Sequence, residues 1–74
     1  MKSFATSTRP KLTQQDIYDG LTKLGLTEEE KPIDGYAFTF FCTPAYAVLS
    51  YQQQHNGKVP ARFWIDRRTF ILAE

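Results

Sequence analysis

Apolar residues recur at helical spacing between Thr13 and Gly25. Thr13 is a favoured N-cap residue, and Asp16 three positions later completes the pattern of a capping box. Gly25 can adopt the left-handed conformation that ends many helices, so the pattern predicts a first helix here. Gly20 lies inside it, and we expect another element to approach closely on that side. The predicted apolar stripe consists of Ile17, Leu21 and Leu24.

A second helix is predicted to begin at Thr43, because a cap residue followed by Pro44 is typical of a helix start. Asn56-Gly57 marks its end. The polar run 50–54 is assigned to the exposed side of this helix. Its predicted apolar stripe consists of Ala45, Val48 and Leu49, with Gln52. Alternatively, three tyrosines form a contact surface with the neighbouring glutamines: Tyr18, Tyr46 and Tyr51.

Strand-like alternation occupies the chain on both sides of the second helix. Residues 36–42 are rich in aromatic side chains and predict the first strand. Alternation returns after Pro60, which lacks an amide donor, and predicts a second strand that ends at Ile65. Residues 69–73 predict the last strand, which a tight turn joins to the second as an antiparallel hairpin.

The order α-β-α-β-β predicts an α/β (α+β) domain. We expect a two-layer sandwich with both helices on one face of a three- or four-stranded mixed sheet. If the strands 36–42 and 60–65 are neighbours, the helix between them makes a right-handed crossover and the strands run parallel. The structural alternative is a winged helix, with 43–56 as recognition helix and 60–73 as wing. That alternative requires a helix where the aromatic strand is predicted.

Two further segments have weaker patterns. Residues 27–30, with one threonine before three glutamates, predict an additional helical turn that Pro32 stops. Residues 1–11 predict a flexible arm or an edge strand, because polar residues dominate there. Residues 12–74 then form a single compact domain.

The composition supports an ordered but small domain. The chain has 74 residues, of which 42% are hydrophobic and 23% charged, and these are ordinary globular values. An aromatic share of 15% lets a small core bury much area. Because so small a core supplies only about 3–5 kcal/mol, a homodimer paired through a sheet edge is also expected as an alternative. The single cysteine, Cys42, and the lack of any membrane-length apolar run predict a reducing, cytoplasmic location with no membrane contact.

The clearest candidate contact surface is the basic C-terminal hairpin. If the strand alternates, Trp64 faces away from Phe63 and Ile65 and is surrounded by basic side chains. An exposed tryptophan beside guanidinium groups suits either nucleic-acid binding or a protein-binding hot spot. In a purely structural reading, Trp64 sits under a helix and the arginines solubilise the hairpin. The predicted binding residues are Lys58, Arg62, Trp64, Arg67 and Arg68.

No constellation of residues predicts catalysis, a metal site or a cofactor. Cys42 and His55 lie at opposite ends of the second helix, about 20 Å apart at 1.5 Å per residue, so they cannot form a catalytic pair. No glycine-rich phosphate loop and no zinc-ligand spacing occurs. The chain is therefore expected not to be an enzyme.

By exclusion, we expect a non-enzymatic interaction module that binds and modulates a larger protein. By analogy, small regulators or inhibitors of bacteria and their mobile elements have this profile. The alternative is a nucleic-acid-binding module that uses the Arg/Trp hairpin, in which affinity falls steeply with salt.

Overall fold

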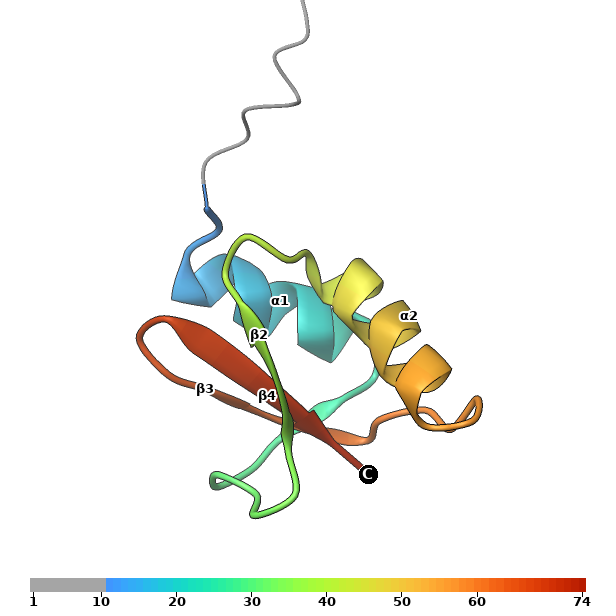
Figure 1. Ribbon diagram of the computed structural model, residues 1–74. Coiled ribbons are helices and arrows are strands. Elements are labelled where there is room, and N and C mark those ends of the chain that lie inside the picture. The colour runs from blue at the N-terminus through green and yellow to red at the C-terminus, as the bar shows by residue number, and fades with distance from the viewer. Residues whose placement is uncertain (1–10) are drawn as a thin grey trace, which may run out of the picture.

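The computed structural model describes residues 11–74, in which two helices cover one face of a four-stranded mixed sheet (Figure 1). The expected two-layer sandwich is thus confirmed. The proposals for residues 1–10 lie outside the described residues. Along the chain, the elements are α1 (Gln14–Lys23), β1 (Thr27–Glu28), β2 (Tyr36–Thr39), α2 (Pro44–Gln54), β3 (Arg62–Ile65) and β4 (Thr69–Ala73).

Helix α1 has the capping pattern that the sequence predicts. The Thr13 hydroxyl accepts a hydrogen bond from the amide of Asp16 (3.1 Å), and the Asp16 carboxylate accepts one from the amide of Thr13 (3.1 Å). At the other end Gly25 has φ 96°, and the amide of Leu26 bonds to the carbonyl of Leu21 (3.1 Å). This bond is part of a Schellman motif, which supplies hydrogen-bond donors to carbonyl groups that have no partner within the helix.

The apolar stripe of α1 is shorter than predicted. Ile17 and Leu21 are fully buried, but Leu24 is 49% exposed because the helix ends there and the chain turns away. Gly20 has the close neighbour that we expected. A Cβ at position 20 would lie 2.6 Å from Cγ of Pro44, the first residue of α2.

This contact gives a first testable prediction. Alanine favours helices over glycine by about 1 kcal/mol, yet Gly20→Ala is expected to destabilise the protein by about 1–3 kcal/mol, because the added methyl group overlaps Pro44. Urea unfolding measures the difference. Lys23→Ala, at an exposed position of the same helix, should change stability by no more than about 0.5 kcal/mol. A more stable Gly20→Ala protein would contradict the close packing of the helices.

Helix α2 begins and ends as predicted but is rotated relative to the prediction. The Thr43 hydroxyl accepts a hydrogen bond from the amide of Tyr46 (3.2 Å), and Asn56 and Gly57 have positive φ beyond the helix end. The buried side of α2 consists of Pro44, Ala47 and Tyr51. Ala45 and Leu49, which were predicted to face the core, are exposed, whereas Tyr51, predicted to be exposed, is 2% exposed.

Two contacts determine this rotation of α2. Pro44 packs against the glycine in α1, and Tyr51 makes an edge contact with Tyr36 of β2, with ring centroids 6.4 Å apart. The buried tyrosine also rules out the contact surface proposed for the three tyrosines.

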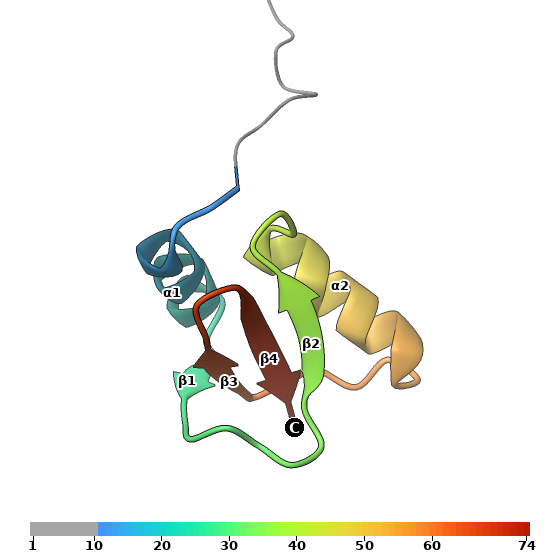
Figure 2. The same cartoon turned by 60° about the vertical axis from the view of Figure 1, so that its left-hand side comes forward.

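The sheet has the order β1-β3-β4-β2, with β4 in its interior (Figure 2). Strand β4 pairs antiparallel with β3 and with β2, whereas β1 pairs parallel with β3. The expected hairpin is confirmed. Strands β2 and β3 are not neighbours, because β4 folds back between them. Residues 36–39 form a strand, which excludes the winged helix.

Two segments differ from the sequence pattern. Thr27–Glu28 forms β1 rather than a helical turn, because the amide of Thr27 bonds to the carbonyl of Ala61 (3.0 Å) and the amide of Glu29 to that of Phe63 (2.9 Å). Strand β2 ends at Thr39 rather than at Cys42, where a turn is closed by a bond from the Cys42 amide to the Thr39 carbonyl (3.1 Å).

The core lies between the helices and the sheet. Its sheet side is formed by Phe63, Phe70 and Leu72, all fully buried, and these pack with Ile17 and Leu21 of α1. On the opposite face of the sheet, Ile71 is 9% exposed because the segment that joins β1 to β2 approaches it closely at Gly35. Both faces of the central strand are therefore covered.

Candidate functional site

The span 35–54 carries no charged side chain, although the chain has nine basic and eight acidic residues. This span contains β2, the turn after it and α2. Several of its large apolar side chains are nevertheless exposed, namely Phe41 at 72%, Tyr46 at 64% and Leu49 at 59%. Uncharged but exposed surface is the composition found at the centre of protein interfaces, where charged residues are depleted.

On one flank of α2, an apolar hollow of about 270 Å³ lies between the end of α1 and the start of α2. We call it the α1–α2 hollow. The hollow forms because the two helices come into close contact at Gly20 and Pro44, whereas the side chains of Leu24 and Ala45 next to this contact are exposed. It is lined by Gly20, Lys23, Leu24, Thr43, Pro44 and Ala45. Only Lys23 among these is charged, so the hollow suits an apolar side chain of another molecule.

On the other flank of α2, a shallow hollow lies at the end of β2. Its walls include Thr39 of β2, Phe41 in the following turn and Tyr46 of α2. The rings of Phe41 and Tyr46 are mostly exposed. The two hollows adjoin at Thr43, which lines both of them, and one extends toward α1 while the other extends toward the free edge of β2.

The predicted basic cluster is divided between the two ends of the β3–β4 hairpin. Arg62 donates from Nε to the carbonyl of Glu74 (2.7 Å), and Lys58 forms an ion pair with the carboxylate of Glu74 (3.6 Å). Arg67 and Arg68 are exposed in the turn at the opposite end. A strand rises about 3.3 Å per residue, so Arg62 and Arg67 lie roughly 15 Å apart along the hairpin. The five predicted residues therefore do not form one cluster.

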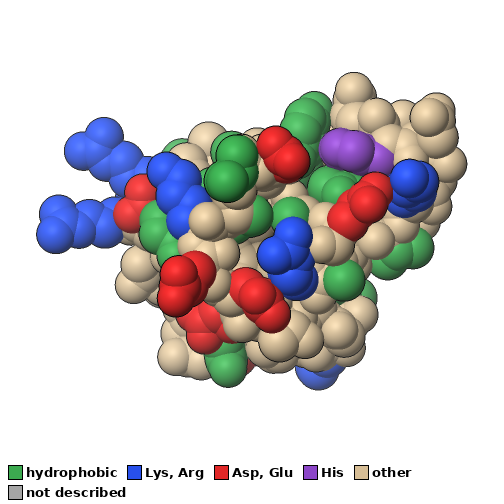
Figure 3. Space-filling model, turned by 90° about the horizontal axis from the view of Figure 1, so that it is seen from below, with side chains coloured by type: hydrophobic (Ala, Val, Ile, Leu, Met, Phe, Trp, Pro, Cys, Tyr) green, Lys and Arg blue, Asp and Glu red, His purple; other side chains and the backbone are tan. Residues whose placement is uncertain are grey.

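Trp64 points away from the helices, as its place in the strand predicted, but its cationic neighbour is Lys31. The Lys31 Nζ lies 5.5 Å from the centroid of the indole ring, and Trp64 is half-buried. Acidic and basic side chains are interspersed over the face seen in Figure 3, and basic side chains project at one end of it. The role of the predicted residues in binding stays a prediction, and mixed charge on this face weakens the case for a phosphate backbone.

A polar hollow of about 480 Å³ gathers titratable groups that the sequence did not bring together. It is lined by Asp34, Tyr51, His55, Arg62, Ala73 and Glu74. The rings of Tyr51 and His55 stack 3.9 Å apart, and His55 Nδ1 donates to the Tyr51 carbonyl (2.7 Å). Burial, and then the carboxylate of Glu74, raise the pKa of Tyr51. The stacked rings pack the C-terminal end of α2 against the sheet, and this gives Tyr51 and His55 a structural role.

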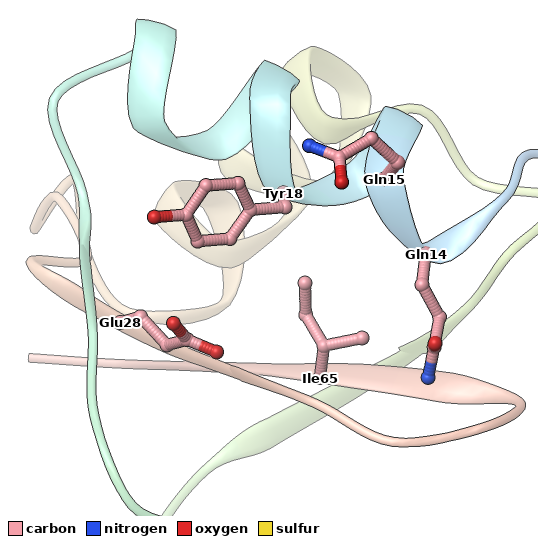
Figure 4. Close-up of a pocket in the computed structure, with 5 residues that line it drawn as sticks. All are labelled: Gln14, Gln15, Tyr18, Glu28 and Ile65. Atoms are coloured by element: carbon pink, nitrogen blue, oxygen red, sulfur yellow. The ribbon is translucent and has the colours of Figure 1, made fainter.

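A smaller hollow of about 230 Å³ separates α1 from β1 and β3 (Figure 4). It is lined by Gln14, Gln15, Tyr18, Glu28 and Ile65. Tyr18 packs edge-on against Phe63 (5.8 Å between centroids), and Gln14 donates from Nε2 to the carbonyl of Asp66 (2.9 Å). These contacts hold α1 on the sheet. The ionisable groups of the lining are the carboxylate of Glu28 and the phenol of Tyr18.

Cys42 and His55 lie at opposite ends of α2, as the sequence predicted, so no thiol–imidazole pair forms between them. Within residues 11–74, no group of three His, Cys, Asp or Glu side chains could hold a metal ion. In the same part of the chain, neither helix is long and apolar enough to cross a membrane.

The thiol of Cys42 gives a second testable prediction. Burial raises its pKa, so at pH 8 the folded protein should react with a thiolate-specific disulfide reagent more slowly than the urea-unfolded chain does. Because the folded state retains this proton longer, the thiol's contribution to stability is present below about pH 8.5 and is lost as the pH rises through the folded pKa. Equal reaction rates in the folded and unfolded protein would contradict the burial of this thiol.

Comparison with known proteins found no matching family model, no matching curated sequence and no matching solved structure. The strongest surface signal, the absence of charge over 35–54, is visible in the sequence. The sequence pattern did not identify this span as a contact surface, because its aromatic residues also fit a buried strand.

Proposed function

We propose that this chain is a non-enzymatic interaction module that binds and modulates a larger protein, and that it does so through the α1–α2 hollow. The single observation that carries the proposal is an open apolar hollow of about 270 Å³ beside an uncharged helix. Hot spots of protein interfaces are apolar or aromatic anchors that fill such hollows, and charged residues are depleted around them.

The partner that fits this surface offers an apolar anchor side chain. Leu24 lines the hollow and is 49% exposed, so an anchor that enters the hollow removes its side chain from water. Lys23 lies at the rim, where it can meet an acidic group of the partner without being buried. A cytoplasmic location and a regulatory or inhibitory role are part of the same proposal.

Nucleic-acid binding is the second candidate function, and one observation favours it. Arg67 and Arg68 are exposed in the β3–β4 turn, and the only salt bridge found within residues 11–74 is the one between Lys58 and Glu74. Both guanidinium groups are thus open to phosphate oxygens. Asp66 lies next to them in the same turn and reduces the local positive charge.

Salt dependence separates the two candidate functions. The immobilised protein is exposed to an extract of the organism that carries it, at about 50 mM and 200 mM salt, and retained protein and nucleic acid are quantified. Affinity that rests on the two phosphate contacts of Arg67 and Arg68 falls by about 10-fold over this range, whereas an apolar anchor tolerates it. Retained nucleic acid that is lost at the higher salt and with the double variant Arg67→Ala, Arg68→Ala would support the second candidate instead.

A further inference from the structure

Among residues 11–74, no partner is found for several backbone groups at the outer edge of β2. The amide of Asp66 bonds to the carbonyl of Thr69 (2.7 Å), so Thr69 and, by alternation, Ile71 direct their backbone groups toward β3. The next residue in β4, Phe70, therefore directs its groups toward β2, where it faces Phe38. It follows that Ala37, one position from Phe38, points its amide and carbonyl away from the sheet.

The same alternation places the Thr39 amide on this outer side. The Thr39 carbonyl accepts a hydrogen bond from the Cys42 amide in the turn. Within the described part of the chain, no bond is found to the Thr39 amide or to the backbone groups of Ala37. Exposed edges of this kind pair with other strands unless charge, proline or a bulge prevents it. Strand β2 has no charged residue and no proline.

The opposite edge of the sheet differs from this one. Strand β1 has only two residues, and three consecutive glutamates, Glu28–Glu30, begin within it. A short, negatively charged edge repels a second copy of itself. Only the β2 edge is therefore suited to pairing.

We propose that the β2 edge is the interface of a homodimer, in which β2 pairs antiparallel with β2 of a second copy. The partner strand belongs to a second copy because this edge is self-complementary. The edge is uncharged, so two copies meet without electrostatic repulsion. A two-fold axis through Phe38 places Ala37 of one copy opposite Thr39 of the other. The outward amide of Thr39 in each copy can therefore donate to the outward carbonyl of Ala37 in the other. The two sheets then become one sheet with all helices on the same side.

Exposed aromatic side chains near this edge supply part of the area that a stable interface needs. A specific interface needs roughly 600 Å² or more from each partner, which is about one-eighth of the 5150 Å² surface. Tyr36, Phe41 and Tyr46 flank the edge with 36%, 72% and 64% of their surface exposed. At about 200 Å² per aromatic side chain, they supply roughly 350 Å², and the backbone and small side chains of β2 add to it. The α1–α2 hollow adjoins this surface at Thr43, but Gly20 and Lys23, which also line it, belong to α1.

The test is the molar mass in solution between about 5 and 500 μM, measured by sedimentation equilibrium. The wild-type chain of 8.6 kDa is expected to approach twice that mass as concentration rises. Ala37→Pro removes an outward amide to which no bond is found within residues 11–74, and Ala37→Lys places a charge at the edge. Both variants should weaken the dimer at least tenfold while their circular dichroism stays that of the wild type.

Two control variants separate this proposal from its alternatives. Glu28→Pro removes the outward amide at the opposite edge and should leave the dimer intact, and Ala45→Asp in the α1–α2 hollow should also leave the mass unchanged. A wild-type chain that dimerises but retains no partner protein would therefore count against the proposed function alone. A wild-type mass of 8.6 kDa at every concentration, or an Ala37→Lys protein that dimerises like the wild type, would overturn the β2 pairing. So would slow exchange of the Ala37 amide in a monomer, which would assign the edge to another segment of the chain.

Discussion

Replacing Phe70 with alanine is expected to leave most of the protein unfolded at 25 °C. Phe70 is fully buried in the interior strand β4, where it stacks on Phe38 (5.6 Å between centroids) and packs against Phe40 (6.4 Å). Truncation of a buried phenylalanine costs about 3–5 kcal/mol. A core of this size supplies about the same total, so little or no stability remains.

Circular dichroism and urea titration measure this loss, and Phe41→Ala is the matched control. Phe41 is adjacent to Phe40 but 72% exposed, so the control should change stability by no more than about 0.5 kcal/mol. If Phe70→Ala were as stable as Phe41→Ala, the assignment of Phe70 to the centre of the core would be wrong.

Replacing Ala45 with aspartate is expected to abolish binding of the partner protein without harming the fold. Ala45 lies in the first turn of α2, where a carboxylate is favoured by about 0.3–1 kcal/mol by the helix dipole. In the complex, the same carboxylate would be buried in the α1–α2 hollow with no charge partner except the rim residue Lys23. Loss of a hot spot costs about 2 kcal/mol or more, which is about 30-fold in affinity.

Gln53→Asp provides the control for this variant. It adds the same charge to the same helix at an exposed position two turns away from the hollow. Titration calorimetry with the purified partner should give nearly the wild-type affinity for Gln53→Asp. Equal losses for the two variants would indicate a general effect of negative charge on α2 rather than a site at the hollow.

Local features of this fold could be predicted from the sequence. The capping box at Thr13 and the Schellman end at Gly25 involve residues within six positions of one another, so the sequence alone encodes them. The same holds for the Thr43-Pro44 start of α2. The direction in which Trp64 points followed from strand alternation.

Features set by distant contacts could not be predicted in this way. The β-pairing of Thr27–Glu28 depends on Ala61 and Phe63, more than thirty positions away. The rotation of α2 depends on the contact of Pro44 with Gly20, which hides Tyr51 and exposes the more hydrophobic Leu49. In each case, a tertiary contact outweighed the local pattern.

The candidate site also combines features that the sequence predicts with features that depend on distant contacts. The basic side chains were predicted to lie together, but Arg62 bonds to Glu74 at one end of the hairpin and Arg67 lies at the other. Their role in binding stays a prediction. The α1–α2 hollow joins residues of two helices, so it becomes visible only once their packing is known.

The most direct test of the proposed function compares the proteins retained from an extract of the organism by three immobilised chains: wild type, Ala45→Asp and Gln53→Asp. Quantitative mass spectrometry should find at least one protein held by the wild type and by Gln53→Asp, unchanged between about 50 and 200 mM salt, and lost with Ala45→Asp. An identical set of retained proteins on all three chains would contradict the assignment of the α1–α2 hollow as the binding site.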